Sequence, residues 1–185
     1  MTTFDPQNTS SGHRHHRRSI RLKGYDYSQE GAYFVTIVTW RRDFLFGEIV
    51  NGEMILNEHG QIADECWREI PNHFPHVELG AYVIMPNHMH GIILINDDVG
   101  ARHASPLQKT PNGVSKGSLG AIIGSYKSAV TRLIGRELNE TGIWQRNYYE
   151  HIIRNDNDLQ NKTDYIEANP LLWEQDHENP VNITT

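Results

Sequence analysis

The feature that most constrains this fold is an apolar run interrupted by two histidines, VIMPNHMHGIILI at residues 83–95. Val, Ile and Leu at this density predict a buried strand. Side chains on a strand alternate between its two faces, so His88 and His90 lie on one face and Met89 points to the other, into the core. Two imidazoles side by side on one face can share a cation or a phosphate.

Length and composition limit what the rest of the chain can be. With 185 residues, of which 37% are hydrophobic, the sequence predicts one domain with a real core. The single cysteine, Cys66, excludes an internal disulfide and a structural zinc site built from several cysteines. The apolar runs are too short to span a bilayer, and the N-terminus lacks the hydrophobic segment of a signal peptide. We therefore expect a cytoplasmic protein with no membrane partner.

Positive charge is concentrated near the N-terminus, although the formal net charge of the chain is −6. The stretch HRHHRRSIRLK at residues 13–23 holds three histidines, no acidic residue and five cations: Arg14, Arg17, Arg18, Arg21 and Lys23. A basic arm on an acidic body is consistent with a surface that contacts backbone phosphates. The alternative interpretation is a disordered, solvated tail.

The order of the expected elements indicates a ferredoxin-like fold. We expect strands at 32–40, 77–85, 88–95 and 144–154, helices at 57–74, 119–138 and 155–170, and a hairpin at 45–57 that turns at Asn51-Gly52. The fold class is then α+β: an antiparallel βαββαβ sheet with helices on one face, plus an inserted β-hairpin and a C-terminal helix. A different α+β sheet is the alternative. The open face of such a sheet suits extended ligands, including single strands.

We expect three segments along the chain. Residues 1–20 form a flexible basic arm, residues 21–175 form the domain, and residues 176–185 form a C-terminal tail. Within the domain, residues 96–118 are polar and rich in Gly, Pro and Ser, which predicts a long loop.

Two residues of the last expected helix can complete a site around the histidines. Tyr165 and Asn169 are four residues apart and share one helix face. A phenol and an amide oxygen near two imidazoles would supply a nucleophile and a third metal ligand. The alternative is that the histidines form a structural pair, Tyr165 is a packing residue and Asn169 is an amide at the helix end. Tyr126, Tyr148 and Tyr149 compete as nucleophiles, although core packing is the simpler interpretation for them.

The segment MPNHMHGIILI, followed far downstream by DYIEANP, resembles the single-tyrosine HUH transposases, in particular the REP-associated tyrosine transposase branch. HUH denotes His, a hydrophobic residue and His, here His88, Met89 and His90. The similarity runs from about residue 20 to residue 175 and includes GSLGAIIGSYKSAVTRLI and GIWQRNYYEHIIRNDNDL. It implies that Tyr165 is the nucleophile and that His88, His90 and Asn169 bind a metal, Mg²⁺ or Mn²⁺.

The resemblance also implies a function and a substrate. We expect a DNA transposase or nuclease that cleaves and rejoins single-stranded, hairpin-containing DNA, such as palindromic repeats, through a 5′-phosphotyrosine intermediate. Backbone phosphates would contact the basic arm together with Arg41, Arg42, Lys127 and Arg132. The alternatives are a catalytically inactive nucleic-acid-binding module on the same fold and a metal-dependent hydrolase in which water attacks. We expect a monomer; a dimer that exchanges the tyrosine helix is the alternative.

Overall fold

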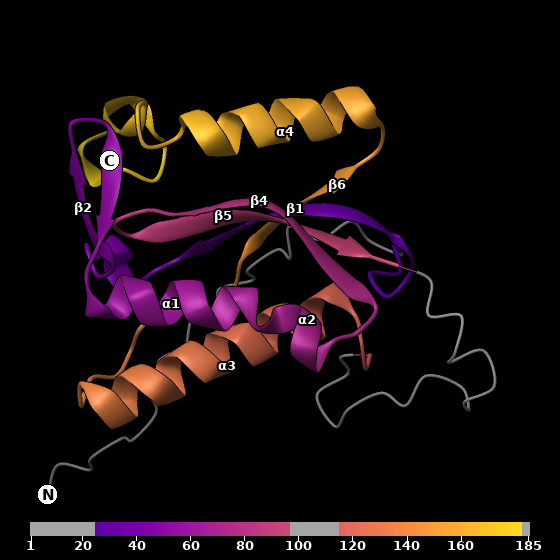
Figure 1. Cartoon of the computed structure of the whole chain (residues 1–185), viewed down its shortest axis with the longest axis horizontal. Helices are drawn as coiled ribbons and strands as arrows, with labels where there is room; N and C mark the ends of the chain where they lie inside the picture. The colour runs from indigo at the N-terminus through magenta and orange to yellow at the C-terminus, as the bar shows by residue number, and fades with distance from the viewer. Residues whose placement is uncertain (1–24, 97–114, 183–185) are drawn as a thin grey trace, which may run out of the picture.

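The centre of the protein is a four-stranded antiparallel sheet, seen in a computed structural model that describes residues 25–96 and 115–182. Its strands lie in the order β4 (Val77–Ile84), β5 (His88–Ile95), β1 (Gly31–Val38) and β6 (Tyr149–Ile153) (Figure 1). Strands far apart in sequence are therefore neighbours, as a βαββαβ order requires. The predicted ferredoxin-like fold is confirmed.

Helices lie on both faces of this sheet (Figure 1). One face is covered by α1 (Glu58–Arg68), the short α2 (Ile70–His73) and α3 (Leu119–Glu137), and the main hydrophobic core lies between these helices and the sheet. The C-terminal helix α4 (Asp156–Ala168) lies across the other face, where Ile166 packs on Phe34 and Ile92. The expectation of an open sheet face is wrong, because this helix covers it.

Alternation along β5 assigns its residues to the two cores. Met89 and Ile93 are fully buried in the larger core, whereas Ile92 belongs to the smaller core under α4. His88 and His90 lie on the α4 side, as the sequence predicts. The two histidines are thus separated from the main core by their own strand.

Each long helix begins at a side-chain cap that the sequence supplies. Asn57, Ser118 and Asn155 accept hydrogen bonds from backbone N–H groups three residues ahead, at the start of α1, α3 and α4 respectively. Such caps satisfy donors that have no partner within the helix. They place α4, and with it Tyr165, at a defined position over the sheet.

Three expected boundaries differ from the structure. The helix expected at 57–74 divides at Glu69, because Pro71 lacks an N–H group and occupies the first turn of α2. The first strand ends at Val38, and Trp40 lies in the 3-10 turn η1 (Trp40–Arg42). The last strand spans 149–153 because Trp144 makes only an isolated bridge with Thr39.

The inserted hairpin consists of β2 (Gly47–Val50) and β3 (Glu53–Leu56), a separate two-stranded sheet. Asn51 and Gly52 adopt φ of 53° and 81°, as a two-residue turn of this kind requires. A Cβ atom on Gly52 would lie 2.6 Å from Leu171, so the hairpin tip contacts the segment after α4. Figure 1 shows the hairpin and the C-terminal segment side by side at one end of the sheet.

The segment after α4 is ordered rather than a loose tail. It forms the short turns η2 (Trp173–Gln175) and η3 (Pro180–Asn182), and it buries Asp176 and Asn179. The tail expected at 176–185 therefore begins inside a packed segment. The basic arm at 1–20 and most of the loop at 96–118 lie outside the described residues. In the parts of the chain that the structure describes, no helix is long and apolar enough to cross a membrane.

Candidate active site

The two histidines of β5 face each other at short range. His88 Nε2 and His90 Nε2 are 3.1 Å apart, and both side chains are buried. Their other ring nitrogens are held by neighbours: His88 Nδ1 lies 2.8 Å from Asn87 Oδ1, and His90 Nδ1 lies 2.8 Å from Thr36 Oγ1 on β1. Such contacts fix ring orientation, as the partners of metal-binding histidines commonly do.

The hydrogen bonds of Asn87 define the tautomer of His88. Asn87 Nδ2 donates to the carbonyl oxygens of Arg42 and Glu178, at 3.3 and 2.8 Å. Asn87 Oδ1 must therefore be the acceptor, and His88 Nδ1 must carry the proton. In the neutral ring, His88 Nε2 then presents a lone pair toward His90, which is the form that binds a metal ion.

Tyr165 on α4 reaches this pair within the same chain. Its Oη atom is 3.3 Å from His90 Nε2, and its ring makes an edge contact with the His90 ring at 5.1 Å between centroids. Phe34 supports both groups, stacking on His90 and contacting Tyr165 edge-on. Tyr165 as a residue is 38% exposed, so part of its side chain is open to solvent beside the histidines.

Asn169 lies one turn further along the tyrosine helix and is buried. Its Nδ2 atom donates to Asp176 Oδ2 at 2.7 Å, whereas its Oδ1 atom is buried without a hydrogen-bond partner. A buried carbonyl oxygen without a partner is costly. Coordination of a cation by this oxygen would offset that cost, so Asn169 keeps its predicted place as a candidate ligand.

Asp176 is the site residue that the sequence analysis missed. Its Oδ2 atom lies 4.0 Å from His90 Nε2 and accepts a hydrogen bond from Tyr165 Oη at 3.3 Å. One ligand atom each from His88, His90 and Asp176 lies within 4.8 Å of the others. No periodicity marks the WEQDHENP stretch, so Asp176 carried no signal beyond being an acidic residue shortly after the tyrosine helix.

Burial determines the charge states of these groups. It lowers the pKa of both His88 and His90 from the ordinary value, and repulsion between the two rings adds to the effect at His88. Burial and the nearby Asp176 carboxylate raise the pKa of the Tyr165 phenol. Burial alone would raise the pKa of Asp176, but His90 and the Asn169 amide hold it well below its usual value. At neutral pH the site therefore has neutral imidazoles, a protonated phenol and a carboxylate.

This donor set fits a divalent metal ion. Two imidazole nitrogens and a carboxylate converge, and the unpaired amide oxygen belongs to Asn169, whose Nδ2 atom contacts that carboxylate. Such mixed nitrogen and oxygen ligands suit divalent ions that retain positions for substrate. The two Nε2 atoms face each other at 3.1 Å, a separation that two ligands of one ion can also have. If the histidines were only a structural pair, the buried Asn169 oxygen without a hydrogen-bond partner would remain unexplained.

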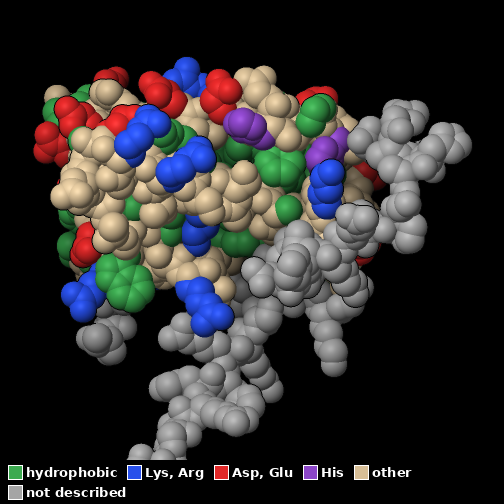
Figure 2. All heavy atoms as spheres, turned by 90° about the horizontal axis from the view of Figure 1, so that it is seen from below, with side chains coloured by type: hydrophobic (Ala, Val, Ile, Leu, Met, Phe, Trp, Pro, Cys, Tyr) green, Lys and Arg blue, Asp and Glu red, His purple; other side chains and the backbone are tan. Residues whose placement is uncertain are grey.

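The predicted phosphate-contacting residues do not gather at the site. Arg42 lies nearby but is paired with Glu178, at 2.8 Å between Nη2 and Oε2. Lys127 and Arg132 lie on α3, on the opposite side of the sheet, where Figure 2 shows Lys and Arg side chains spaced apart rather than forming one basic patch. Lys127 Nζ donates to the carbonyl oxygens of Gln145 and Asn147.

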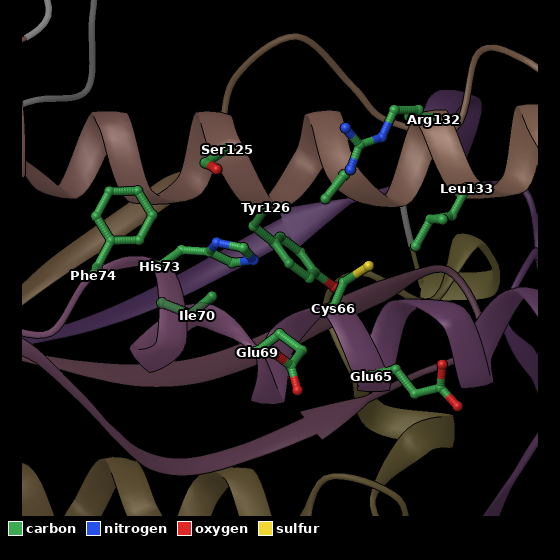
Figure 3. A pocket seen from close by; sticks show the side chains of 11 residues that line it. Glu65, Cys66, Glu69, Ile70, His73, Phe74, Ser125, Tyr126, Arg132 and Leu133 are labelled. Carbon is green, nitrogen blue, oxygen red and sulfur yellow. The ribbon is translucent and has the colours of Figure 1, made fainter.

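Arg132 borders a groove between α1, α2 and α3 (Figure 3). Glu65 and Glu69 line the same groove, which makes it an unfavourable phosphate site. The five cations of the basic arm, Arg14, Arg17, Arg18, Arg21 and Lys23, lie outside the described residues. Arg41 is exposed next to the site.

The competing tyrosines lie elsewhere. Tyr126 is buried among the helices, where its Oη atom donates to the carbonyl oxygen of Ala63. Tyr148 packs against the main core. Tyr149 is 48% exposed on β6, opposite Thr36, and is separated from the histidines by β1. Among the described tyrosines, Tyr165 alone has its hydroxyl within hydrogen-bonding distance of the histidines.

A ferredoxin-like sheet that presents a His-hydrophobic-His pair to a tyrosine on a covering helix is the arrangement that the resemblance to the single-tyrosine HUH transposases implies. A Haemophilus influenzae protein named only as uncharacterised is 45% identical over 166 residues, covering 88% of this chain and 92% of that protein. A second protein of that organism, named "Putative REP-associated tyrosine transposase", is 28% identical over 158 residues, covering 79% of this chain and 73% of its own.

A solved structure of a REP-associated tyrosine transposase bound to a REP hairpin is similar in fold, with a TM-score of 0.56 and 22% identity. The similarity covers 82% of this chain and 73% of the solved one. No protein-family model matches the sequence. The chain is thus similar in sequence to a putative REP-associated tyrosine transposase and similar in fold to a solved one. These similarities support a transposase role, that of a nucleic-acid-processing enzyme.

Proposed function

We propose that this protein cleaves and rejoins single-stranded DNA that contains a hairpin, by transesterification through Tyr165. The observation that carries the proposal is the Tyr165 hydroxyl, which lies 3.3 Å from His90 Nε2 within one chain, on a residue that is 38% exposed. The similar solved transposase bound to a REP hairpin supports a palindromic hairpin as the substrate class.

In the proposed reaction Tyr165 Oη attacks the phosphorus atom of a DNA phosphodiester. The Oη–P bond forms and the bond from phosphorus to the 3′-oxygen breaks, which leaves a 5′-phosphotyrosine and a free 3′-hydroxyl. Because the phosphodiester energy is retained in the new linkage, a second strand end can reverse the step without ATP. The leaving 3′-oxygen takes up one proton while the phenol loses one, so the step is balanced.

The chain's own residues prepare this step in two ways. Thr36 and Asn87 hold the imidazoles, and Asn169 holds Asp176, so that the four candidate ligands form one rigid group. Asp176 Oδ2 and His90 Nε2 both lie 3.3 Å from Tyr165 Oη and are the two acceptors toward which the phenolic proton can move. A divalent ion, Mg²⁺ or Mn²⁺, bound by His88, His90, Asp176 and Asn169 would neutralise charge on the phosphate and favour the phenolate.

The decisive experiment is the capture of the covalent intermediate. Labelled single-stranded hairpin DNA is incubated with the protein and Mn²⁺, and adducts that survive SDS are resolved on a gel. We expect an adduct with the unchanged protein and none with Tyr165→Phe, because only the attacking oxygen is removed. Tyr126→Phe is the matched control, since the Tyr126 hydroxyl bonds only a core carbonyl, and it should form the adduct.

Other outcomes identify the rival functions. Binding of the hairpin without an adduct at any metal concentration would indicate a catalytically inactive nucleic-acid-binding module. Cleavage that survives Tyr165→Phe would indicate a hydrolase in which water attacks. Equal loss of the adduct in both tyrosine variants would show that the nucleophile is wrongly assigned.

A further inference from the structure

A short loop, residues 40–44, borders the candidate site and has no role in the chemistry described above. It wraps around the Pro86-Asn87 turn that precedes His88: Thr39 N donates to the Asn87 carbonyl oxygen and Leu45 N to that of Pro86. The ring of Phe44 contacts Trp173 at 5.7 Å, and Trp173 contacts His88 at 6.0 Å. The 40–44 loop is therefore one ring away from the histidine pair.

The loop carries two aromatic side chains, two arginines and the carboxylate of Asp43, and all of them except the half-buried Arg42 are exposed. Trp40 is 52% and Phe44 57% exposed, which is unusual for the two most hydrophobic aromatic side chains. Arg41 between them is exposed, and within the described residues its guanidinium has no hydrogen-bond or ion-pair partner. Arg42, in contrast, is paired with Glu178 and braces the loop against the C-terminal segment.

The backbone of the loop is held in an unfavourable conformation. Arg41 and Arg42 are consecutive residues with φ of 57° and 61°, in the left-handed region that favours glycine. Trp40 N donates to the Ile143 carbonyl oxygen, and Asn87 Nδ2 donates to that of Arg42, which hold the two residues there. Strain of this kind persists where the surroundings impose it, and it is common at binding sites.

We propose that the 40–44 loop is a stacking platform for unpaired bases of the single-stranded DNA next to the scissile phosphate. The faces of Trp40 and Phe44 receive bases, and Arg41 binds the phosphate between them. Exposed aromatic rings with an interleaved cation are the usual means of holding single strands, because every base offers a face for stacking. That the bound strand is the DNA substrate depends on the proposed function. That the loop can stack unpaired bases depends only on the exposed side chains of the loop itself.

A single strand fits this surface better than the other occupants. Bases in a duplex are already stacked and cannot cover the rings of Trp40 and Phe44. Two arginines and Asp43 leave the loop itself with one net positive charge. Arg42 is held by Glu178, so among the described residues of the loop Arg41 is the cation available to a phosphate. The segment is also attached through Asn87 to His88, so a strand held on it would be positioned relative to the site.

The test measures binding without chemistry. All variants are built on Tyr165→Phe, and the affinity for a fluorescent hairpin with an unpaired 5′ extension is measured by anisotropy at fixed salt. We expect Trp40→Leu and Phe44→Leu each to weaken binding by about 5- to 100-fold, the range expected for loss of one stacked base. Trp40→Phe keeps a ring and should restore most of the affinity.

Two controls separate stacking from general effects. Ile55→Ala removes an apolar side chain of the same exposure, 51%, from the neighbouring hairpin and should leave affinity unchanged. A fully paired duplex of the same sequence should bind the Leu variants and the parent equally. The proposal is overturned if both Leu variants keep full affinity for the single strand. It is also overturned if they lose as much affinity for the duplex as for the single strand.

The outcome does not depend on the adduct assay. If no covalent adduct forms but the Leu variants still lose single-strand affinity, the platform stands and the proposed reaction fails. If the adduct forms and the Leu variants bind single strands as well as the parent does, the reaction stands and the platform fails. If this protein shows no preference for single-stranded DNA and instead captures another protein through the 40–44 loop, the loop is assigned to a protein partner.

Discussion

At the scale of single residues, Gly91 shows how the strand behind the histidines is packed. A Cβ atom at this position would lie 2.4 Å from Cζ2 of Trp67, so the indole ring occupies the space of the missing side chain. Trp67 is fully buried and also contacts Tyr82 and Tyr126. The ring cannot retreat easily, and a larger residue at 91 must displace β5 or the ring.

We therefore expect Gly91→Ala to lower the free energy of unfolding by about 1–3 kcal/mol, the usual cost of overfilling a packed core. Gly124→Ala is the control, because a Cβ atom there meets nothing within 4 Å. In the middle of α3 it should stabilise the protein by about 0.5–1 kcal/mol. Urea denaturation of both variants measures the difference, and equal stability of the two would contradict this packing.

The only cysteine gives a prediction about reactivity with pH. Burial, aided by Glu65, raises the pKa of the Cys66 thiol to about 11, compared with an ordinary value of 9.0. The thiolate is the reactive form, so at pH 8 iodoacetamide should modify Cys66 about 100-fold more slowly than an exposed thiol. The rate should rise about tenfold per pH unit until pH approaches 11. Mass spectrometry of the native protein measures the rate of Cys66 modification, and the urea-unfolded protein is the rapidly modified control. Rapid modification of the native protein at pH 8 would contradict the raised pKa.

The sequence predicted four of the residues that the structure brings together at the candidate site, but not Asp176. His88, Met89 and His90 are assigned to faces by strand alternation alone, and Tyr165 and Asn169 share a face by helical spacing. Asp176 could not be found in this way, because it lies in a segment without periodicity. Its position depends on local bonds such as that from Glu178 N to Asp176 Oδ1 and on packing against the site, which only the folded chain reveals.

At the scale of elements, the sequence predicted the helices and the hairpin, but it did not predict the conformation of the 40–44 loop that leads from the first strand to the hairpin. The Asn51-Gly52 turn and the caps of the long helices are local signals, and the hairpin and helices form as expected. The sequence placed only Trp40 in an expected strand and assigned residues 41–44 to no element. Their left-handed backbone is imposed by bonds to the distant Ile143 and Asn87, which no local pattern encodes.

This imposed conformation predicts that the 40–44 loop is less stable than it could be. Arg41→Gly places a residue that tolerates positive φ at a φ of 57°, so we expect the free energy of unfolding to rise by about 0.5–1 kcal/mol. Arg132→Gly in the middle of α3 is the matched control and should lower it by about 1 kcal/mol. Urea denaturation tests both, and a destabilised Arg41→Gly protein would show that the arginine contributes more than its strain costs.

At the scale of the whole molecule, the candidate site joins segments that are distant in the sequence. The histidines come from β5, the phenol and amide from α4, and the carboxylate from the segment that follows it. These side chains come together only when the sheet, the covering helix and the C-terminal segment are all folded. A ligand that binds all of these segments should therefore stabilise the complete fold.

We expect Mn²⁺ to raise the melting temperature by about 5–10 °C at a concentration 100 times its dissociation constant. His88→Gln combined with His90→Gln should abolish the rise, and Asn169→Ala should reduce it. His151→Gln is the control, since His151 pairs with Asp158 away from the site. Differential scanning fluorimetry measures the shift, and an equal rise in the double variant would place the metal elsewhere.

Asn87 has a consequence for how such a protein can change over time. One amide group contacts the 40–44 loop, the first histidine and the C-terminal segment through three separate hydrogen bonds. A relative that acquires a different loop shifts this amide relative to its old C-terminal segment, because one NH2 group donates one hydrogen to each of them. Exchanging the loop alone between homologues should therefore impair the histidines, whereas exchanging loop and C-terminal segment together should preserve them.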